Sequence, residues 1–311
     1  MNPAFSVIIF TTIAGAAQGM VVALAIASLA GVSSISDSFL SYSLLLALAM
    51  LLIGLGASFL HLGRPERAWR AVLMWRTSWL SREVIVLPAF IGVVALWWLA
   101  LQTMQSAWLL TLLPLIAIAI AALLWYCTAM IYACLRFIQE WAHPLTIVNY
   151  TLLGLSSGLV LVSALAAIFG QPELLHVTGP CALLLTLAGW ATRMSALKRN
   201  AGIKHRSTLQ SATGIRSAKL VQKSMGMTGG SFNTREFFHG VTLLAMKRIR
   251  WALVLLGFAV PVALMLLGLL LQSPAPWVAA FIVQVPGLIA DRWMFFAQAK
   301  HPQNLYYQVV S

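Results

Sequence analysis

The chain has 311 residues, of which 61% are hydrophobic and only 9% are charged, and its formal net charge at pH 7 is +13. Soluble domains carry about 25% charged residues, so this composition excludes a water-soluble fold of the same length. It predicts an all-α polytopic membrane protein, because helices satisfy their own backbone hydrogen bonds within hydrocarbon.

Eight segments are apolar over the roughly 20 residues that a membrane-spanning helix requires. They cover residues 5–30, 40–60, 83–102, 107–133, 146–170, 177–196, 250–272 and 276–297. No Lys or Arg precedes the first segment, which is also longer than the apolar region of a cleaved signal peptide, so we expect it to be the first membrane helix. We expect a single integral membrane domain over residues 1–311, with a polar connection at about 197–249.

Closely spaced glycines occur in the first and fifth segments. The stretch GAAQG places Gly15 and Gly19 four residues apart, and GLSSG does the same for Gly154 and Gly158. This spacing is typical of membrane helices whose backbones pack closely. Gln18 lies within the first of these stretches, and its carboxamide needs a partner in hydrocarbon, either a neighbouring helix or a bound polar headgroup.

The stretch HLGRPERAW, residues 61–69, follows the second segment. Gly63 lets the backbone turn out of a helix, and Pro65 suits the first position of a new one. The residues that follow would give a helix one polar and one apolar side. This pattern predicts a short helix that lies in the membrane interface. Glu66 and Arg70 are four residues apart, and we expect them to form an ion pair on this helix.

His61 at the start of this stretch has two interpretations. In the first, it only ends a helix, and the arginines that follow only orient the chain. In the second, it belongs to a pocket for a quinone, an amphipathic two-proton carrier that needs a group able to exchange protons near neutral pH. Glu83, at the start of the third segment, would then extend the route for protons. The residues alone leave both interpretations open.

The charges fall on two very unequal sides of the predicted membrane domain. All 20 Lys and Arg residues lie on one side, and Asp37 and Glu173 are the charges of the other. The positive-inside rule therefore predicts that both termini and the 197–249 connection are cytoplasmic. Most tryptophans, including Trp97 and Trp277, lie near segment ends, where we expect them to act as interface anchors.

Metal sites are not expected. Cys127, Cys134 and Cys181 lie in apolar segments without a Cys-x-x-Cys pair, so we expect small buried helix residues and no iron–sulfur cluster held by this chain. None of the six histidines lies in the middle of a segment, whereas a haem in a membrane protein usually has histidines deep on facing helices. We assign no catalytic residue to the chain itself.

Three stretches carry a resemblance to a known family. These are FTTIAGAAQGM, HLGRPERAW together with SWLSRE, and HPLTIVNYTLLGLSSG. They resemble the membrane-anchor subunits of molybdenum oxidoreductases of the dimethyl sulfoxide reductase type, the DmsC family, which are eight-helix proteins that bind the quinone and carry no redox centre. HLGRPERAW and GGSFNTREFFHG look most like the anchors of cytoplasmic sulfite dehydrogenase (sulfite:quinone oxidoreductase) complexes.

The resemblance implies a function and a set of partners. The chain would be a non-catalytic anchor in the inner membrane that passes electrons between an iron–sulfur subunit and ubiquinone or menaquinone. A molybdopterin subunit would convert the substrate. No nucleic acid is expected as a partner. The family's quinol-site histidine maps onto His61. The expected quinone-binding residues are His61, Arg64, Gln18, Glu83, Gly63 and Trp69. The residues expected to dock the iron–sulfur subunit are Arg199, Arg206, Arg216, Lys219, Lys223, Arg235 and Phe237.

Three alternatives stay open at this point. A polysulfide-reductase-type anchor would have partners on the outer side, which the charge distribution disfavours. An anchor of the dimethyl sulfoxide reductase type would oxidise quinol. A secondary transporter would belong to a different class, but transporters tend to show inverted repeats and charges at the membrane midplane, and the sequence shows neither.

Overall fold

The protein is described from a computed structural model that places residues 1–32, 35–60, 62–103, 106–221, 239–302 and 304. Within these residues there is no strand, and eight helices are long and apolar enough to cross a membrane, which confirms the predicted fold class. They are α1 (Phe5–Leu29), α2 (Asp37–Phe59), α3 (Trp79–Thr103), α4 (Ala107–Ala133), α5 (Pro144–Ile168), α6 (Pro172–Ala201), the continuous α9–η3–α10 (Leu243–Leu271) and α11 (Pro274–Ala297).

The ends of these helices follow local sequence signals. The Ser36 side chain accepts a hydrogen bond from the backbone N–H of Phe39 at the start of α2. His143 does the same for Leu145 at the start of α5, where Pro144 occupies the first turn. Two helices extend further than hydropathy predicts: α6 continues to Ala201, and α9 begins at Leu243. Hydropathy marks only the part of a helix in hydrocarbon, whereas these helices continue with charged turns into the polar region.

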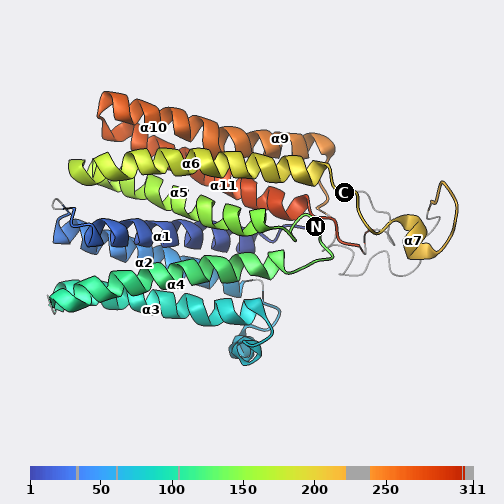
Figure 1. The fold of residues 1–311 in the computed structure, drawn as a ribbon, viewed down its shortest axis with the longest axis horizontal. Coiled ribbons are helices and arrows are strands. Elements are labelled where there is room, and N and C mark those ends of the chain that lie inside the picture. Colours follow the sequence, from blue (N-terminus) through green and yellow to red (C-terminus); the bar gives the residue numbers. More distant parts are fainter. Residues whose placement is uncertain (33–34, 61, 104–105, 222–238, 303, 305–311) are drawn as a thin grey trace.

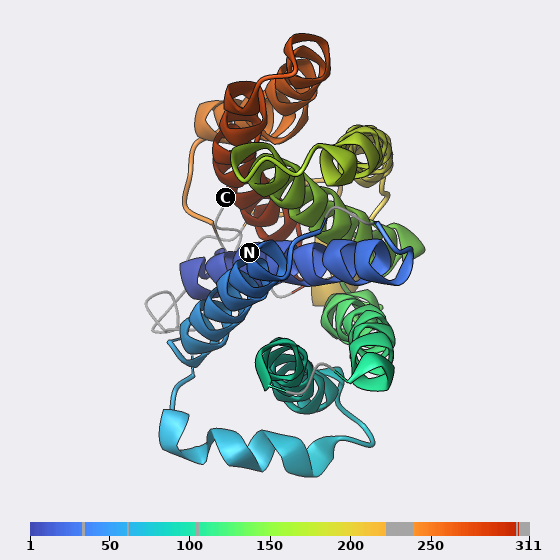
Figure 2. The same ribbon diagram turned by 90° about the vertical axis from the view of Figure 1, so that its left-hand side faces the viewer.

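Helix α1 lies at the centre of the bundle. Figures 1 and 2 show it between a group formed by α2, α3 and α4 and a second group formed by α5, α6, α9–α10 and α11. It is the most deeply buried of the eight membrane helices. A polar residue on α1 therefore faces other helices rather than lipid, which is the setting in which Gln18 is found.

The contact between α1 and α5 depends on the predicted glycines. A Cβ atom added to Gly19 would lie 2.0 Å from the carbonyl oxygen of Gly154, and one added to Gly158 would lie 2.2 Å from the carbonyl carbon of Gly19. No side chain fits at these distances, so the two backbones touch. This confirms the predicted close packing of the first and fifth segments.

Two tryptophans that we expected to anchor the interface are instead core residues. Trp97 and Trp277 are both 1% exposed. The Trp277 ring packs against Gly179 of α6 and Gly268 of α10, where an added Cβ would lie within 3 Å of it. Glycines on neighbouring helices leave room for the ring, and position along a segment does not reveal such a space. Trp69, Trp75, Trp108 and Trp251 are exposed.

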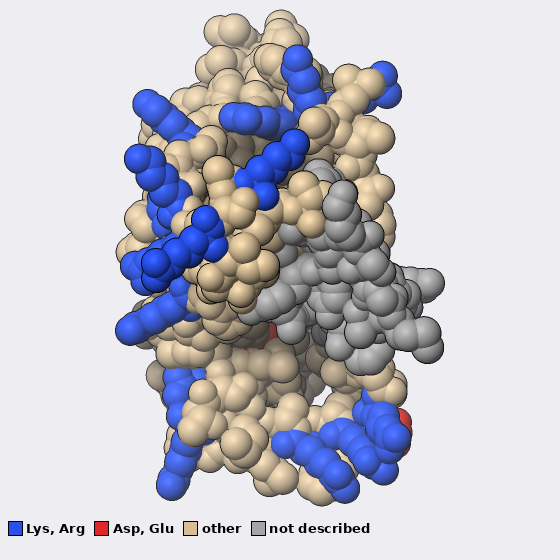
Figure 3. All heavy atoms as spheres, turned by 90° about the vertical axis from the view of Figure 1, so that its right-hand side faces the viewer, with Lys and Arg blue, Asp and Glu red and all other residues tan. Residues whose placement is uncertain are grey.

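One end of the bundle collects the N-terminus, the end of α11, η1 (Pro65–Met74) and α7 (Leu209–Thr213), and we call it the basic end (Figure 1). Lys and Arg side chains are spread over it, with few acidic ones (Figure 3). The short helix predicted after His61 is confirmed as η1, which runs across the direction of the membrane helices (Figure 2).

The expected Glu66–Arg70 ion pair is wrong. Glu66 instead approaches Arg67, with 4.0 Å between the carboxylate oxygen and Nε. The reason is that η1 is a 3₁₀ helix with three residues per turn, so residues four apart do not share a face. Arg70 lies over the ring of Trp69, with its guanidinium carbon 5.6 Å from the ring centroid.

We predict that Gly158→Ala disrupts the bundle, whereas Gly56→Ala does not. The added methyl at position 158 meets backbone atoms of α1, so the loss in unfolding free energy should reach or exceed the ~1–3 kcal/mol of ordinary overpacking. Gly56 is exposed and has open space around it. The measurement is unfolding of the detergent-purified protein. Equal stability of the two variants would contradict the contact between α1 and α5.

Candidate functional site

A buried polar pocket lies where α1, α4, α5 and α11 meet. Its cavity volume is about 10 Å³, which is room for about one water molecule. Its lining residues are Phe10, Thr11, Ala14, Gly15, Gln18, Trp125, Thr128, Tyr150 and Arg292. All of them are buried. We call this space the Gln18 pocket.

Three polar atoms of the Gln18 pocket lack a hydrogen-bond partner among the described residues. They are the carbonyl oxygen of Gln18, the indole Nε1 of Trp125 and the hydroxyl of Tyr150. Buried polar groups are usually paired with protein or with bound water. Trp125 reaches this place because Gly154 has no side chain, since a Cβ there would lie 2.6 Å from the indole nitrogen. The pocket thus offers both an acceptor and a donor to a polar occupant.

The pocket lies in the half of the bundle nearer the basic end. Tyr150 is six residues after the start of α5, and Arg292 is five residues before the end of α11. With a rise of 1.5 Å per residue, both lie about 8–9 Å inside the helix ends. A polar occupant here would be close to the end of the bundle that carries the basic residues.

Glu83 is connected to the same pocket. The sequence predicts this carboxylate at the mouth of the third segment, but the structure buries it within the bundle, where it is 5% exposed. The Thr128 hydroxyl on α4 donates a hydrogen bond to Glu83 on α3, and Thr128 lines the Gln18 pocket. Two residues of the predicted quinone site, Gln18 and Glu83, are therefore brought together through a residue that the sequence analysis did not select.

The other predicted quinone-site residues are not brought to this pocket. Gly63, Arg64 and Trp69 are exposed on and beside η1 and do not line it. His61 lies outside the described residues. Thus the structure brings Gln18 and Glu83 together and leaves Gly63, Arg64 and Trp69 at the surface.

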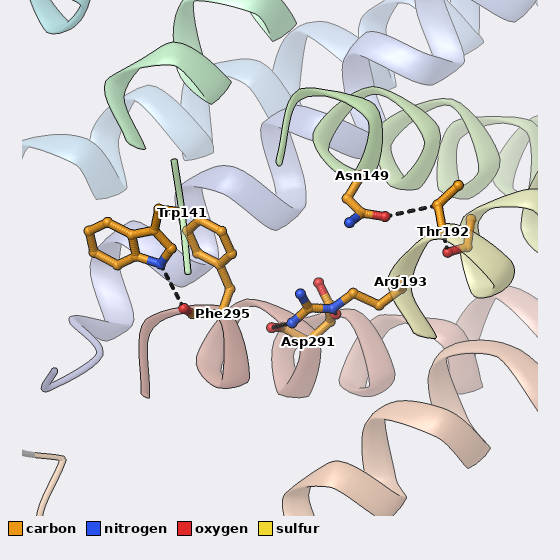
Figure 4. Close-up of polar contacts among 7 residues, drawn as sticks. Trp141, Asn149, Thr192, Arg193, Asp291 and Phe295 are labelled. Carbon is orange, nitrogen blue, oxygen red and sulfur yellow. Dashed lines mark hydrogen bonds and ion pairs between the residues drawn. The ribbon is translucent and has the colours of Figure 1, made fainter. Parts of the chain in front are cut away.

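A second polar pocket lies closer to the basic end, between α5, α6 and α11 (Figure 4). Arg193 of α6 donates through Nε to the Asp291 carboxylate of α11, and through Nη2 to the Asp291 carbonyl oxygen at 3.3 Å. The hydroxyl of Thr192, the residue before Arg193 in α6, donates to Asn149 Oδ1 of α5 at 2.8 Å. We call this space the Arg193 pocket.

Arg292 connects the two pockets. It is 4% exposed, and its guanidinium carbon lies 3.9 Å from the centroid of the Tyr150 ring. The ring face provides an attractive surface for a desolvated cation. Arg292 and Tyr150 line both the Gln18 pocket and the Arg193 pocket, and they are the residues that the two linings share.

Ionisable side chains lie at the Glu140 side of the Arg193 pocket. Oε1 of Glu140 lies 3.7 Å from Nε2 of His205, and His143 lines the pocket beside them. Partial burial, and then the charge of Arg199, lowers the pKa of His143. Arg199 donates to the Gln139 carbonyl oxygen at 2.9 Å, so its guanidinium is held within this chain.

The sequence analysis missed the Arg193 pocket, although a signal for it was present. The predicted segments 177–196 and 276–297 already contained Arg193, Asp291 and Arg292, and ionisable residues inside a membrane helix indicate function. In the sequence, these residues stand out only as charges of the basic side. Their pairing could not be seen, because it joins residues 98 positions apart.

No group of three His, Cys, Asp or Glu side chains that could hold a metal ion occurs in the part of the chain that the structure places. Cys127 is buried as expected, but Cys134 and Cys181 are exposed. The expectation of three buried cysteines is therefore wrong for two of them, because an apolar segment also has a face that packs against no other helix.

Comparison with known proteins identifies the family. The sequence profile of the DMSO reductase anchor subunit (DmsC) family matches residues 1–286. The chain belongs to the DmsC family. It is also 50% identical, over 326 aligned positions that cover 100% of both chains, to a sulfite dehydrogenase subunit of Allochromatium vinosum. The resemblance noted in the sequence is thereby confirmed, and this DmsC-family chain is a membrane anchor of an oxidoreductase complex, which implies catalytic and electron-transfer partners.

We predict that Asp291→Ala destabilises the protein strongly because it leaves Arg193 charged and unpaired in the bundle. Removing one partner of a buried ion pair costs about 3–5 kcal/mol. The double variant Arg193→Met with Asp291→Leu should recover most of this loss. The control Glu66→Ala removes an exposed pair and should cost no more than about 1 kcal/mol. Denaturant unfolding in detergent measures all three, and a double variant as unstable as Asp291→Ala would contradict the pairing argument.

Proposed function

We propose that this protein is the quinone-reactive anchor of a complex that oxidises sulfite. An iron–sulfur subunit would deliver electrons from a molybdopterin subunit, and the anchor would bind ubiquinone or menaquinone from the lipid. The observation that carries the proposal is the buried Gln18 pocket, which combines an unpaired acceptor, an unpaired donor and, through Thr128, a carboxyl group. The identity to a sulfite dehydrogenase subunit supports the choice of substrate.

The chemistry of quinone reduction explains why these groups are needed. Each quinone takes up two electrons and two protons to become a quinol. Donors near the ring oxygens stabilise the negative charge that develops there, and a proton-exchanging group must lie close. In the proposal, the Gln18 pocket is the inner end of the site, where Glu83 supplies a proton through Thr128. His61 and Arg64 belong to its outer end, where His61 hydrogen-bonds one carbonyl and Arg64 balances negative charge. Gly63 and Trp69, which are exposed and do not line the Gln18 pocket, are proposed to contact the ring at that outer end.

A second candidate is an anchor that oxidises quinol, as the description of the matched family as a DMSO reductase anchor suggests. The same groups would then accept protons instead of giving them. We favour quinone reduction because the full-length relative at 50% identity is a sulfite dehydrogenase subunit.

We further propose that the basic end faces the cytoplasm and that the protein lies in the inner membrane. The positive-inside rule supports this orientation. The iron–sulfur subunit would dock on the same end, where Arg206, Arg216 and Lys219 are exposed. Arg199 contributes less to such a surface because its guanidinium is bound within the chain. Lys223, Arg235 and Phe237 lie outside the described residues.

We predict that reversing the charge at Arg206, Arg216 and Lys219 to Glu slows docking of the soluble subunits. Charges at the rim of an interface mainly steer association, so the loss should be larger at low salt. The control is Ser207→Ala with Ser217→Ala, which changes the same connection without changing its charge. Membrane retention of the partner subunits is the measurement. Unchanged retention in the reversed variant would show that these charges only orient the chain.

We predict that His61→Ala and Glu83→Gln each lower sulfite-dependent quinone reduction by roughly 100-fold, the usual range for loss of a proton-transferring group. Sulfite oxidation with an artificial dye should continue, because the dye takes electrons before they reach the anchor. The control is His176→Ala, at an exposed position of α6 at the other end of the bundle. If an assembled His61→Ala complex reduces quinone at a near wild-type rate, His61 only ends a helix and has no part in the quinone site.

A further inference from the structure

We propose that the Arg193 pocket and the Gln18 pocket together form a path that carries protons from the basic end to Glu83. The path begins at Glu140 and His205, passes Tyr150 and Arg292, and ends at Thr128. This inference rests on the proposed quinone reduction and adds to it a proton inlet that is separate from His61.

The first support is continuity. Tyr150 and Arg292 line both pockets, so the two pockets adjoin at these side chains. Thr128 then lines the Gln18 pocket and donates to Glu83. Polar side chains are thus present at each stage between the surface and the buried carboxyl group.

The second support is the set of unpaired atoms along this line. Oε2 of Glu140, the Tyr150 hydroxyl and Oε1 of Gln18 are buried without a hydrogen-bond partner among the described residues. Buried polar atoms of this kind typically bind ordered water, which makes about three hydrogen bonds at such sites. Each pocket has room for about one water molecule, and in the proposal this water links polar side chains that do not contact each other directly.

The third support is the division of roles among the ionisable groups. Arginine keeps its proton, so Arg193 and Arg292 cannot relay one. Arg193 is neutralised by Asp291, and Arg292 is held over the ring of Tyr150. The carboxyl groups at the two ends, Glu140 and Glu83, remain as the groups that take up and release protons.

The proton balance follows from the position of the inlet. Oxidation of sulfite with water gives sulfate, two electrons and two protons on the partner subunits. Reduction of quinone consumes two electrons and two protons. Because the path opens on the basic end, where the partners are proposed to dock, both protons are released and consumed on the same side of the membrane. The complex would then move no net charge across the membrane.

Tyr150→Phe tests the path because it removes the hydroxyl and keeps the ring that holds Arg292. In the assembled complex, sulfite-dependent quinone reduction should fall by roughly tenfold or more, with dye-linked oxidation unchanged. Its solvent deuterium isotope effect should increase, and added imidazole should restore part of the rate by carrying protons in solution. The matched control is Tyr126→Phe, since Tyr126 is an exposed residue of α4 that lines neither pocket.

Glu140→Gln provides a second variant at the surface end of the path, and it should give the same three effects if Tyr150→Phe fails to assemble. A lower rate without a larger isotope effect would overturn the path, because it would show a packing defect. An unchanged rate of quinone reduction in these variants would also overturn the path. If His61→Ala still lowers quinone reduction in that case, the proposed quinone function stands without the path. The last test uses proteoliposomes supplied with sulfite and quinone. If turnover generates a membrane potential, the protons are taken up on the side opposite the basic end, which contradicts the proposed inlet.

Discussion

The direct contact between the backbones of α1 and α5 at Gly19, Gly154 and Gly158 brings the polar groups of this protein together. It places α1 in the centre of the bundle, so Gln18 faces other helices instead of lipid. It also leaves space on α5 for the Trp125 ring beside Gly154. In hydrocarbon, polar groups find partners only in the protein or in bound water. Close packing of small residues therefore both stabilises the bundle and determines where a polar pocket forms.

Buried charge is the second organising feature. Arg193 and Asp291 form an ion pair between α6 and α11, and Arg292 lies over Tyr150 of α5. Charged groups at this depth are costly unless they are paired, so the three helices are held in a defined arrangement where these residues meet. The same arrangement leaves the two polar pockets adjoining at Tyr150 and Arg292. The same residues that pair the buried charges therefore also line the two adjoining polar pockets.

These features suit a membrane anchor of an oxidoreductase complex and the proposed exchange of electrons with a carrier in the lipid. Lys and Arg side chains are spread over the basic end (Figure 3), and helix η1 extends from the same end. The part of the Gln18 pocket that Tyr150 and Arg292 line lies about one and a half helical turns inside that end. Electron delivery, carrier binding and proton supply can therefore be arranged within one half of the membrane.

Much of the architecture was determined by the sequence alone. Eight apolar segments, the glycine spacings of GAAQG and GLSSG, and the one-sided distribution of Lys and Arg are local or periodic features, and a bilayer allows few other folds. Gln18 and Glu83 were selected because polar residues in apolar segments are rare. The family could also be identified from short stretches of the chain.

Only the tertiary structure decided which of these residues meet. Thr128 joins Glu83 to the Gln18 pocket, and Arg193 finds Asp291 across 98 positions of sequence. Hydropathy records how apolar a segment is but not the direction in which each side chain points, so Trp277 was expected at the interface and is found against Gly179 and Gly268. Contacts between helices depend on their rotation and depth, which are determined by packing among all eight and not by any one segment.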